Sequence, residues 1–189
     1  MSKNKLIFGS LLILITFSTL FIISIPSIYS ENKAGKIEKE IITNFDFLQK
    51  EEKNYVLLYF GFVGCTTICP PALNEISEIY EKLDKTKFSF YFVNLQEDTP
   101  PENVELFVKV FHPDFKGVYL DKENITKTIS KLNVKYAKAL FDKNDIEHSG
   151  FLYFLEKENN LFVQKYIYTT KPFAIDLIAN ELNKIEKGK

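Results

Sequence analysis

The chain has 189 residues, and 46% of them are hydrophobic, which is enough for the core of one compact domain. Its 24 basic and 25 acidic side chains leave a formal net charge of −1. A chain with so little net charge has no strong field to attract nucleic acid or anionic lipid, and we expect no nucleic-acid partner.

The first thirty residues read as a membrane-directing segment. Lys3 and Lys5 precede an apolar run from Leu6 to about Ile28, which is long enough to cross a bilayer as a helix. Lysines before the run place the N-terminus in the cytoplasm and the rest of the chain outside. A cleaved signal peptide is the alternative, but the candidate small-x-small cleavage sites are poor. We therefore expect residues 1–30 to be an anchor or signal segment, with the anchor favoured.

After this segment we expect a polar tether over residues 31–41 and one domain over residues 42–189, which faces the periplasm or outer side of the membrane. In chain order, the pattern predicts a strand at 55–62, a helix from Pro70, a strand at 87–94, helices at 99–111 and 121–132, strands at 150–155 and 161–168 around a turn at 157–160, and a helix that opens at Lys171-Pro172. This alternation predicts an α/β fold with a mixed central sheet flanked by helices, and thioredoxin-like topology fits it best.

The two cysteines stand out as a site. Cys65 and Cys69 lie four positions apart, where a buried strand ends and a helix begins. The partial positive charge of a helix N-terminus favours thiolate over thiol, and metal binding and disulfide exchange both need a thiolate. In a regular helix, the Cα atoms of residues four apart are about 6 Å from each other, which allows a disulfide or a shared metal ion.

Three chemistries remain open for this pair. A plain stabilising disulfide is disfavoured, because so short a loop gains little from closure. Redox motifs in thioredoxin-like proteins more often have two residues between the cysteines, and this chain has three, so the spacing favours metal. Two thiolates form a soft donor set that suits copper(I) or zinc.

A third ligand is expected from a histidine. His148 lies just before a predicted strand, in a loop that runs beside the cysteines in a thioredoxin-like sheet. Its imidazole completes a set that accepts copper in both oxidation states. The other histidine, His112, ends a helix before a proline, where it more often caps the helix or packs against aromatic rings. We therefore favour His148.

Together these residues resemble the SCO/SenC family of copper-binding proteins. The elements that carry the resemblance occur in the family's order over about residues 45–185: Tyr59-Phe-Gly-Phe, Cys65-Thr-Thr-Ile-Cys69-Pro70, Glu97-Asp98-Thr99-Pro100, Phe111-His-Pro-Asp-Phe115 and Glu147-His148-Ser149. The resemblance implies a membrane-tethered, thioredoxin-like copper metallochaperone. It also implies a copper ion, as Cu(I) and also Cu(II), held by Cys65, Cys69 and His148. The implied partner is the copper-bearing subunit of cytochrome c oxidase, or another copper or thiol protein, during assembly of the oxidase copper centre.

The chain departs from the family pattern at two places. Thr67 stands where family members commonly have an aspartate, and Asn94-Leu95 stands where many have Asp-Pro. Acidic groups near a metal site tune its affinity and redox behaviour, so these departures bear on the Cu(II) form.

The alternative function is a thiol–disulfide oxidoreductase that acts on exported or oxidase cysteines. Cys65 would attack a partner disulfide and Cys69 would resolve the mixed disulfide. His148 separates the two functions, because disulfide exchange does not need it and a copper site does.

Overall fold

The computed structural model describes residues 3–31, 34–138 and 146–188. The chain forms two units, Met1–Gly35 and Lys36–Lys189. The first unit contains one helix, α1 (Lys3–Glu31), whose described side chains between positions 10 and 22 are exposed. By length and hydropathy, none of the helices in the described part of the chain qualifies as a membrane span.

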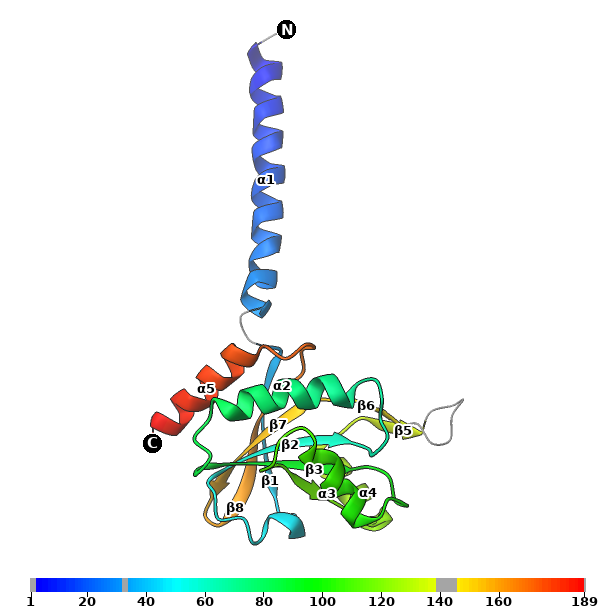
Figure 1. Ribbon diagram of the computed structural model, residues 1–189. Coiled ribbons are helices and arrows are strands. Elements are labelled where there is room, and N and C mark those ends of the chain that lie inside the picture. Colours follow the sequence, from blue (N-terminus) through cyan, green and yellow to red (C-terminus); the bar gives the residue numbers. More distant parts are fainter. Residues whose placement is uncertain (1–2, 32–33, 139–145, 189) are drawn as a thin grey trace. The chain divides into compact units, whose positions relative to one another are not determined.

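The second unit is a mixed sheet flanked by helices (Figure 1). Its strands form a six-stranded sheet in the order β1-β8-β7-β2-β3-β4 and a separate two-stranded sheet, β5-β6. Their bounds are β1 (Lys36–Thr43), β2 (Tyr55–Gly61), β3 (Phe88–Asn94), β4 (Lys116–Val118), β5 (Tyr136–Lys138), β6 (Ile146–His148), β7 (Leu152–Glu158) and β8 (Leu161–Tyr168). The helices are the short 3-10 helix η1 (Asp46–Leu48), α2 (Cys69–Glu81), α3 (Pro101–Lys109), α4 (Lys122–Leu132) and α5 (Ile175–Lys187).

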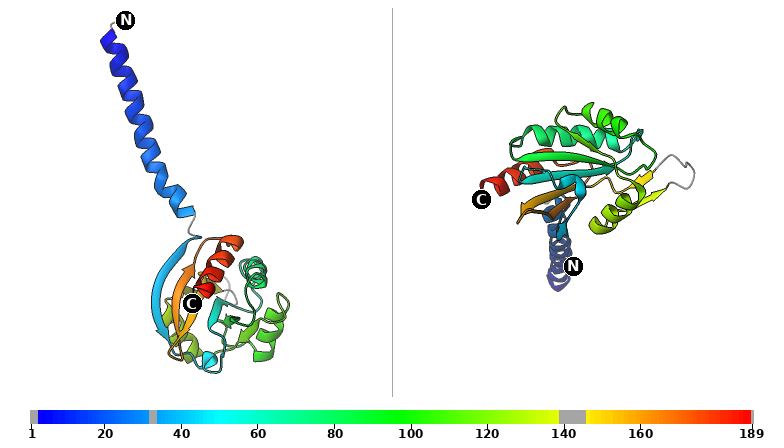
Figure 2. Two further views of the ribbon diagram at one scale, coloured as in Figure 1. Left: turned by 90° about the vertical axis from the view of Figure 1, so that its left-hand side faces the viewer. Right: turned by 90° about the horizontal axis from the view of Figure 1, so that it is seen from below.

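The strand directions confirm the predicted mixed sheet. β2, β3 and β4 run parallel, whereas β7 pairs antiparallel with β2, β8 with β7 and β1 with β8. Helices α2, α3 and α5 lie on one face and α4 on the other, as the view from below shows (Figure 2). β2 and β3 are buried at every position, because helices cover both faces of the sheet centre. The two cysteines follow β2, one of these buried central strands.

Helix α4 and the β7–β8 hairpin have, at their ends and turns, residues whose side chains or backbone conformations suit those positions. Asp121 caps α4 by accepting a hydrogen bond from the Asn124 backbone N–H at 2.8 Å, and Asn133 closes the helix in the left-handed region at φ 51°. Asn159 and Asn160 have positive φ angles of 48° and 65°, as a tight hairpin turn requires, and they connect β7 to β8. The hairpin predicted at 157–160 thus forms, with the strand extending through Glu158.

The predicted tether is partly wrong. Residues 31–41 were expected to be a polar linker, yet β1 begins at Lys36 and pairs along β8, so the compact unit begins before residue 42. β1 is an edge strand whose side chains are mostly exposed and charged. Such a strand is held in the sheet by backbone hydrogen bonds rather than by buried side chains. Its sequence therefore does not need the alternation of apolar and polar residues that predicts a strand.

Two helices also differ from their predicted bounds. The last helix begins at Ile175 rather than at Lys171-Pro172, and the Phe173 backbone N–H before it donates to the Glu75 carboxylate at 2.8 Å. Phe173 therefore packs from an extended segment. The helix expected through Phe111 ends at Lys109, and the Phe111 carbonyl accepts a hydrogen bond from Ser77 on α2.

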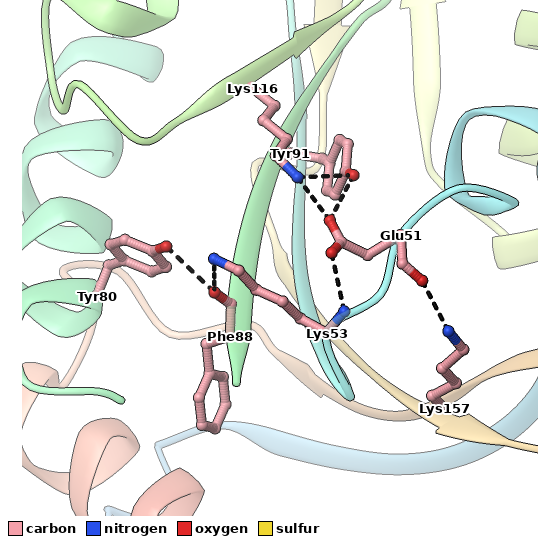
Figure 3. A network of polar contacts seen from close by, with 7 residues as sticks. All are labelled: Glu51, Lys53, Tyr80, Phe88, Tyr91, Lys116 and Lys157. Carbon is pink, nitrogen blue, oxygen red and sulfur yellow. Dashed lines mark hydrogen bonds and ion pairs between the residues drawn. The ribbon is translucent and has the colours of Figure 1, made fainter. Parts of the chain in front are cut away.

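A buried ionic network ties the sheet together near the start of β2 (Figure 3). The Glu51 carboxylate accepts hydrogen bonds from Lys116 at 2.7 Å, Tyr91 at 2.6 Å and the Lys53 backbone N–H at 3.0 Å. Burial pushes the pKa of Glu51 upward, but these donors outweigh it and lower the pKa to about 2. The network joins the segment before β2 to β3 and β4, so it lies at the opposite end of β2 from the cysteines.

Candidate metal centre

The cysteines lie where β2 gives way to α2. β2 ends at Gly61, and Cys65 lies in the loop that follows, while α2 begins at Cys69. The regular helical spacing assumed for the pair is therefore wrong, since only Cys69 is helical. Instead, the Cys69 backbone N–H donates to the Cys65 Sγ at 3.3 Å. Cys65 thus takes the place of a capping side chain at the N-terminus of α2.

Gly61 makes room for the second sulfur. A Cβ atom at this position would lie 2.8 Å from the Cys69 Sγ and 2.8 Å from the Phe92 ring. Real Cβ atoms essentially never come so close to other heavy atoms. The glycine is therefore a requirement for placing Cys69 against the end of β2.

His148 reaches the sulfurs from the end of β6. Its Nε2 lies 3.5 Å from the Cys69 Sγ, and its Nδ1 accepts a hydrogen bond from the Gly150 backbone N–H at 3.2 Å. The rings of Tyr59 and Phe62 meet the imidazole edge-on, with interplanar angles of 90°. These contacts aim Nε2 at the cysteines. Gly150 has φ +58°, a conformation that glycine adopts easily, and it turns the chain toward β7.

The geometry brings together the three residues predicted from the sequence. One ligand atom from each of Cys65, Cys69 and His148 lies within 4.8 Å of the other two. Metal–sulfur bonds of about 2.3 Å and metal–nitrogen bonds of about 2.0 Å place the three ligands of one trigonal ion about 3.7–4.0 Å apart. The three atoms therefore lie near the separations that one ion needs, and small side-chain movements would close them around it.

The surroundings of the two cysteines shift the pKa values of their thiols in opposite directions. A hydrogen bond from the Cys69 side chain lowers the pKa of Cys65, and burial raises it. Hydrogen bonds from His148 and the Thr67 backbone N–H also lower this pKa, which therefore lies well below its ordinary value. The hydrogen bond to Cys65, together with burial and the Cys65 charge, raises the pKa of the Cys69 thiol. Both cysteines are free and buried. In the copper-free pair the surroundings therefore favour the thiolate form at Cys65 and the thiol form at Cys69.

His112 lies apart from this site and has a structural role. Its Nε2 contacts the Glu81 carboxylate at 2.6 Å, and its Nδ1 accepts a hydrogen bond from the Asp114 backbone N–H at 3.1 Å. Its ring packs against Tyr80 and Phe115. The expectation that this histidine packs beside aromatic rings is confirmed.

The sequence did not reveal the residues that support the site. Asn94 is fully buried, its Oδ1 accepts a hydrogen bond from the Val63 backbone N–H at 3.1 Å, and its Nδ2 donates to the Gln96 carbonyl at 2.6 Å. The Leu95 N–H donates to the Gly61 carbonyl at 2.7 Å. The two bonds of the Asn94 side chain need an amide, and the bond from Leu95 needs a backbone N–H, which proline lacks. These contacts give a structural reason for Asn94-Leu95 in place of the Asp-Pro that many family members have. Thr67 is exposed, and its side chain has no structural role that explains its presence.

A shallow cavity of about 510 Å³ adjoins the site on the side of α2. Ile68 and Ser149, the chain neighbours of Cys69 and His148, contribute to its lining, together with Pro71, Glu75 and Lys171. The Lys171 Nζ lies 3.5 Å from the centre of the Phe173 ring and 5.3 Å from the centre of the Tyr59 ring. The cavity leaves open space next to the cysteine pair.

Comparisons with known proteins agree with this arrangement. The family model described as SCO1/SenC matches residues 42–185. A SCO2-like protein of Rickettsia felis is 32% identical over 173 residues, which cover 86% of this chain and 80% of that protein. The mitochondrial SCO1 homolog 1 of Arabidopsis thaliana is 31% identical over 126 residues, which cover 61% of this chain and 37% of that protein.

Solved structures show the same fold. Arabidopsis thaliana ScoI with copper bound aligns with a TM-score of 0.64 at 23% identity, covering 81% of this chain and 99% of that one. Apo Sco1 from Thermus thermophilus aligns with a TM-score of 0.60 at 24% identity, covering 79% and 92% of the two chains. The predicted thioredoxin-like α/β fold is thus confirmed as the fold of Sco1 proteins.

Proposed function

The chain belongs to the SCO1/SenC family, and on that basis we propose that it binds one copper ion through Cys65, Cys69 and His148 and delivers it to the copper centre of cytochrome c oxidase. The observation that carries the proposal is the convergence of two sulfurs and one imidazole nitrogen within 4.8 Å. The donor set supports copper, because thiolates are soft ligands that select Cu(I) and imidazole also accepts Cu(II). Structural zinc sites take four protein ligands, whereas the described residues supply three here.

Copper binding requires a local change of hydrogen bonding at His148. A neutral imidazole carries one proton, and Nδ1 accepts a hydrogen bond from Gly150, so that proton is on Nε2 in the metal-free ring. When Nε2 binds copper, the proton has to be on Nδ1, where it faces the Gly150 N–H. That contact must then open, so loading the site involves the turn between β6 and β7.

Delivery by ligand exchange fits the position of the site. The cysteine pair is buried but lies beyond the end of β2, and the adjoining cavity gives a partner's ligands room to approach. Copper can move to an acceptor by exchanging one ligand at a time, without net chemical turnover. The acceptor we propose is the copper-bearing subunit of the oxidase.

The second candidate function is thiol–disulfide exchange, which the unequal thiols favour. The Cys65 thiolate attacks one sulfur of a partner disulfide, a mixed disulfide forms, and the partner's other sulfur leaves as a thiolate. Cys69 then loses its proton and attacks the Cys65 sulfur, which releases the second partner thiolate. The chain ends as a Cys65–Cys69 disulfide and the partner is reduced by two electrons.

A Cu(I) titration of the reduced full chain in detergent micelles, against a chromogenic Cu(I) chelator, tests copper binding. We expect one ion per chain, and lower affinity in Cys65→Ser, Cys69→Ser and His148→Ala, with His112→Gln as the control that keeps wild-type affinity. Wild-type affinity in His148→Ala would rule out the three-ligand site.

The two functions separate when the acceptor is the purified copper domain of the oxidase subunit. Copper transfer to the reduced domain should be lost in His148→Ala, whereas reduction of its disulfide form by the copper-free chain should still proceed in this variant. If only the second reaction occurs, the oxidoreductase function stands and the delivery function fails.

We also propose that the first thirty residues attach the chain to a membrane, with the copper-binding unit on its outer or periplasmic side. The proposal rests on the apolar sequence from Leu6 to about Ile28 and on Lys3 and Lys5 before it. Alkaline extraction of membranes and protease accessibility in spheroplasts test it. A chain released by alkali, or protected from external protease, would contradict it.

A further inference from the structure

The cavity beside the metal centre contains a lysine whose charge the proposed function does not use. The volume of this cavity is about 510 Å³, which lies in the range of ligand-binding cavities, about 300–1,000 Å³. Its lining includes Ile68, which directly precedes Cys69, and Ser149, which directly follows His148. A group that enters the cavity therefore lies beside the chain neighbours of two of the proposed copper ligands.

The cysteines themselves offer a partner almost no surface. Cys69 has no exposed surface and Cys65 is 6% exposed, whereas Ile68, which lies between them in the sequence, is 44% exposed. An acceptor that takes copper by ligand exchange has to bring a donor atom to these sulfurs, so it needs a binding surface next to them. The cavity and the exposed Ile68 side chain provide such a surface.

Lys171 brings a positive charge to this cavity without a counter-ion. Its Nζ lies over the rings of Phe173 and Tyr59, and it makes no hydrogen bond or ion pair within residues 3–31, 34–138 and 146–188. Aromatic faces attract a cation but accept no ordinary hydrogen bond from its three N–H groups. Burial lowers the pKa of Lys171 to about 8, so the side chain is still mostly charged at pH 7.

The lysine side chain reaches the turn that carries the histidine ligand. A Cβ atom at Gly150 would lie 3.6 Å from the Lys171 Cε, and the Gly150 backbone N–H donates to the His148 Nδ1 at 3.2 Å. Glu75 is the acidic residue in the cavity lining, but its Oε2 already accepts a hydrogen bond from the Phe173 backbone N–H at 2.8 Å. The cavity thus combines apolar walls with an ammonium whose donors are open, which is the complement of a carboxylate beside an apolar side chain.

We propose that this cavity binds a segment of the copper acceptor in which a carboxylate pairs with Lys171 and a neighbouring apolar side chain packs on Ile68. The inference rests on the delivery function proposed above and names the chemistry by which the acceptor is recognised. A carboxylate supplies the hydrogen-bond acceptors that the ammonium lacks, and bonds between charged groups are the strong ones. Lys171 then determines which acceptor docks, while copper is held by Cys65, Cys69 and His148.

Transfer of Cu(I) from the loaded full chain to the reduced, purified copper domain of the oxidase subunit tests this role. Stopped-flow rates are measured over a range of acceptor concentrations. Lys171→Met removes the charge and keeps a long apolar side chain. We expect the half-saturating acceptor concentration to rise about tenfold in this variant and the maximal rate to change by less than about twofold, because docking is weakened and ligand exchange is not.

Three further variants separate the charge in the cavity from the charge of the whole chain. Lys171→Arg keeps a cation and should stay close to the wild type. Glu75→Gln removes the charge that opposes a carboxylate and should lower the half-saturating concentration. Lys122→Met removes an exposed lysine of α4, on the other face of the sheet (Figure 2), and should match the wild type. Equal effects of Lys122→Met and Lys171→Met would show that net charge governs recognition, against the inference.

Alkylation of the copper-free chain separates this inference from the proposed function, because it needs no copper. Iodoacetate carries a carboxylate and iodoacetamide does not, so the ratio of their rates at Cys65 reports how well the site attracts a carboxylate. We expect this ratio to fall about threefold in Lys171→Met and to keep its wild-type value in Lys122→Met.

The outcomes decide the two claims separately. If the wild type delivers copper and the half-saturating concentration is unchanged in Lys171→Met, the inference is wrong, whatever the alkylation ratio, although the delivery function stands. If the wild type passes no Cu(I) to the domain, the delivery function fails. The alkylation ratio then decides the role of Lys171, and an equal ratio in the wild type and Lys171→Met would overturn it.

Discussion

The backbone N–H of Cys69 donates a hydrogen bond to the Sγ of Cys65 across 3.3 Å, so the first cysteine caps the helix that the second one begins. The N-terminus of α2 carries partial positive charge, which favours the anionic form of the Cys65 sulfur that lies against it. The two sulfurs are thereby made chemically unequal before any metal or partner arrives.

This inequality predicts selective alkylation of the reduced chain. Iodoacetamide at neutral pH should modify Cys65 before Cys69, because the pKa of Cys65 is lowered and that of Cys69 is raised. The rate at Cys65 should be flat between about pH 6 and pH 8, where an ordinary thiol accelerates about tenfold per pH unit. Peptide mass spectrometry after timed quenching measures both. Equal labelling of the two cysteines, or a rate that climbs steeply through this range, would contradict the assignment.

Gly61→Ala should damage the metal site by crowding the Cys69 sulfur, which would lie 2.8 Å from the new methyl group. We expect a loss of about 1–3 kcal/mol in unfolding free energy and a drop of at least tenfold in Cu(I) affinity. Ile76→Val, in the same buried helix face, is the control, with a cost of about 0.5–1.5 kcal/mol and unchanged affinity. Urea unfolding and chelator competition measure the two effects. Full copper affinity in Gly61→Ala would show that the sulfur does not need this space.

The Asn94 amide should not be replaceable by a carboxylate. In Asn94→Asp the bond from the Val63 N–H survives, but the donor to the Gln96 carbonyl is lost and two acceptors face each other. We expect a loss of about 1–3 kcal/mol in unfolding free energy. Asn103→Asp, at an exposed position of α3, should change stability by less than about 0.5 kcal/mol. Equal effects of the two substitutions would refute the role of Asn94 in holding the cysteine loop.

The Glu51 network predicts how stability depends on pH. The pKa of this carboxyl is lowered from 4.5 to about 2 on folding, so its stabilising effect is complete above pH 4.5 and is lost as pH falls toward 2. Glu51→Gln should cost on the order of 2–3 kcal/mol at pH 7, and the difference from wild type should shrink between pH 5 and pH 3. Glu123→Gln, which removes an exposed ion pair with Lys127, is the control with a small, pH-independent effect. A constant difference for Glu51→Gln across this range would argue against the network.

Much of this fold could be predicted because its central elements carry strong patterns. β2 and β3 consist mostly of aromatic and aliphatic residues, and the structure buries every residue in them. β1 was not predicted, because an edge strand in which Lys and Glu make up half of the residues resembles a linker and is held by backbone pairing with β8. Hydrophobic sequence patterns indicate which side chains are buried. They do not indicate a strand that is held in the sheet mainly by backbone hydrogen bonds.

The site was predictable in its ligands but not in its supports. Cys65 and Cys69 are the only cysteines, and the position of His148 before a strand suggested that it lies beside them. The sequence marked Tyr59 and Asn94 only through the family pattern, because their contacts depend on which face of the sheet meets α2 and on the path of the loops. Those relationships exist only in three dimensions.

X-ray absorption spectroscopy of the Cu(I)-loaded chain tests the central claim most directly, because it counts the atoms bound to the metal. We predict two sulfurs at about 2.3 Å and one nitrogen at about 2.0 Å, with the nitrogen lost in His148→Ala. A spectrum with sulfur ligands alone, identical in the wild type and in His148→Ala, would contradict a copper site made by these three residues.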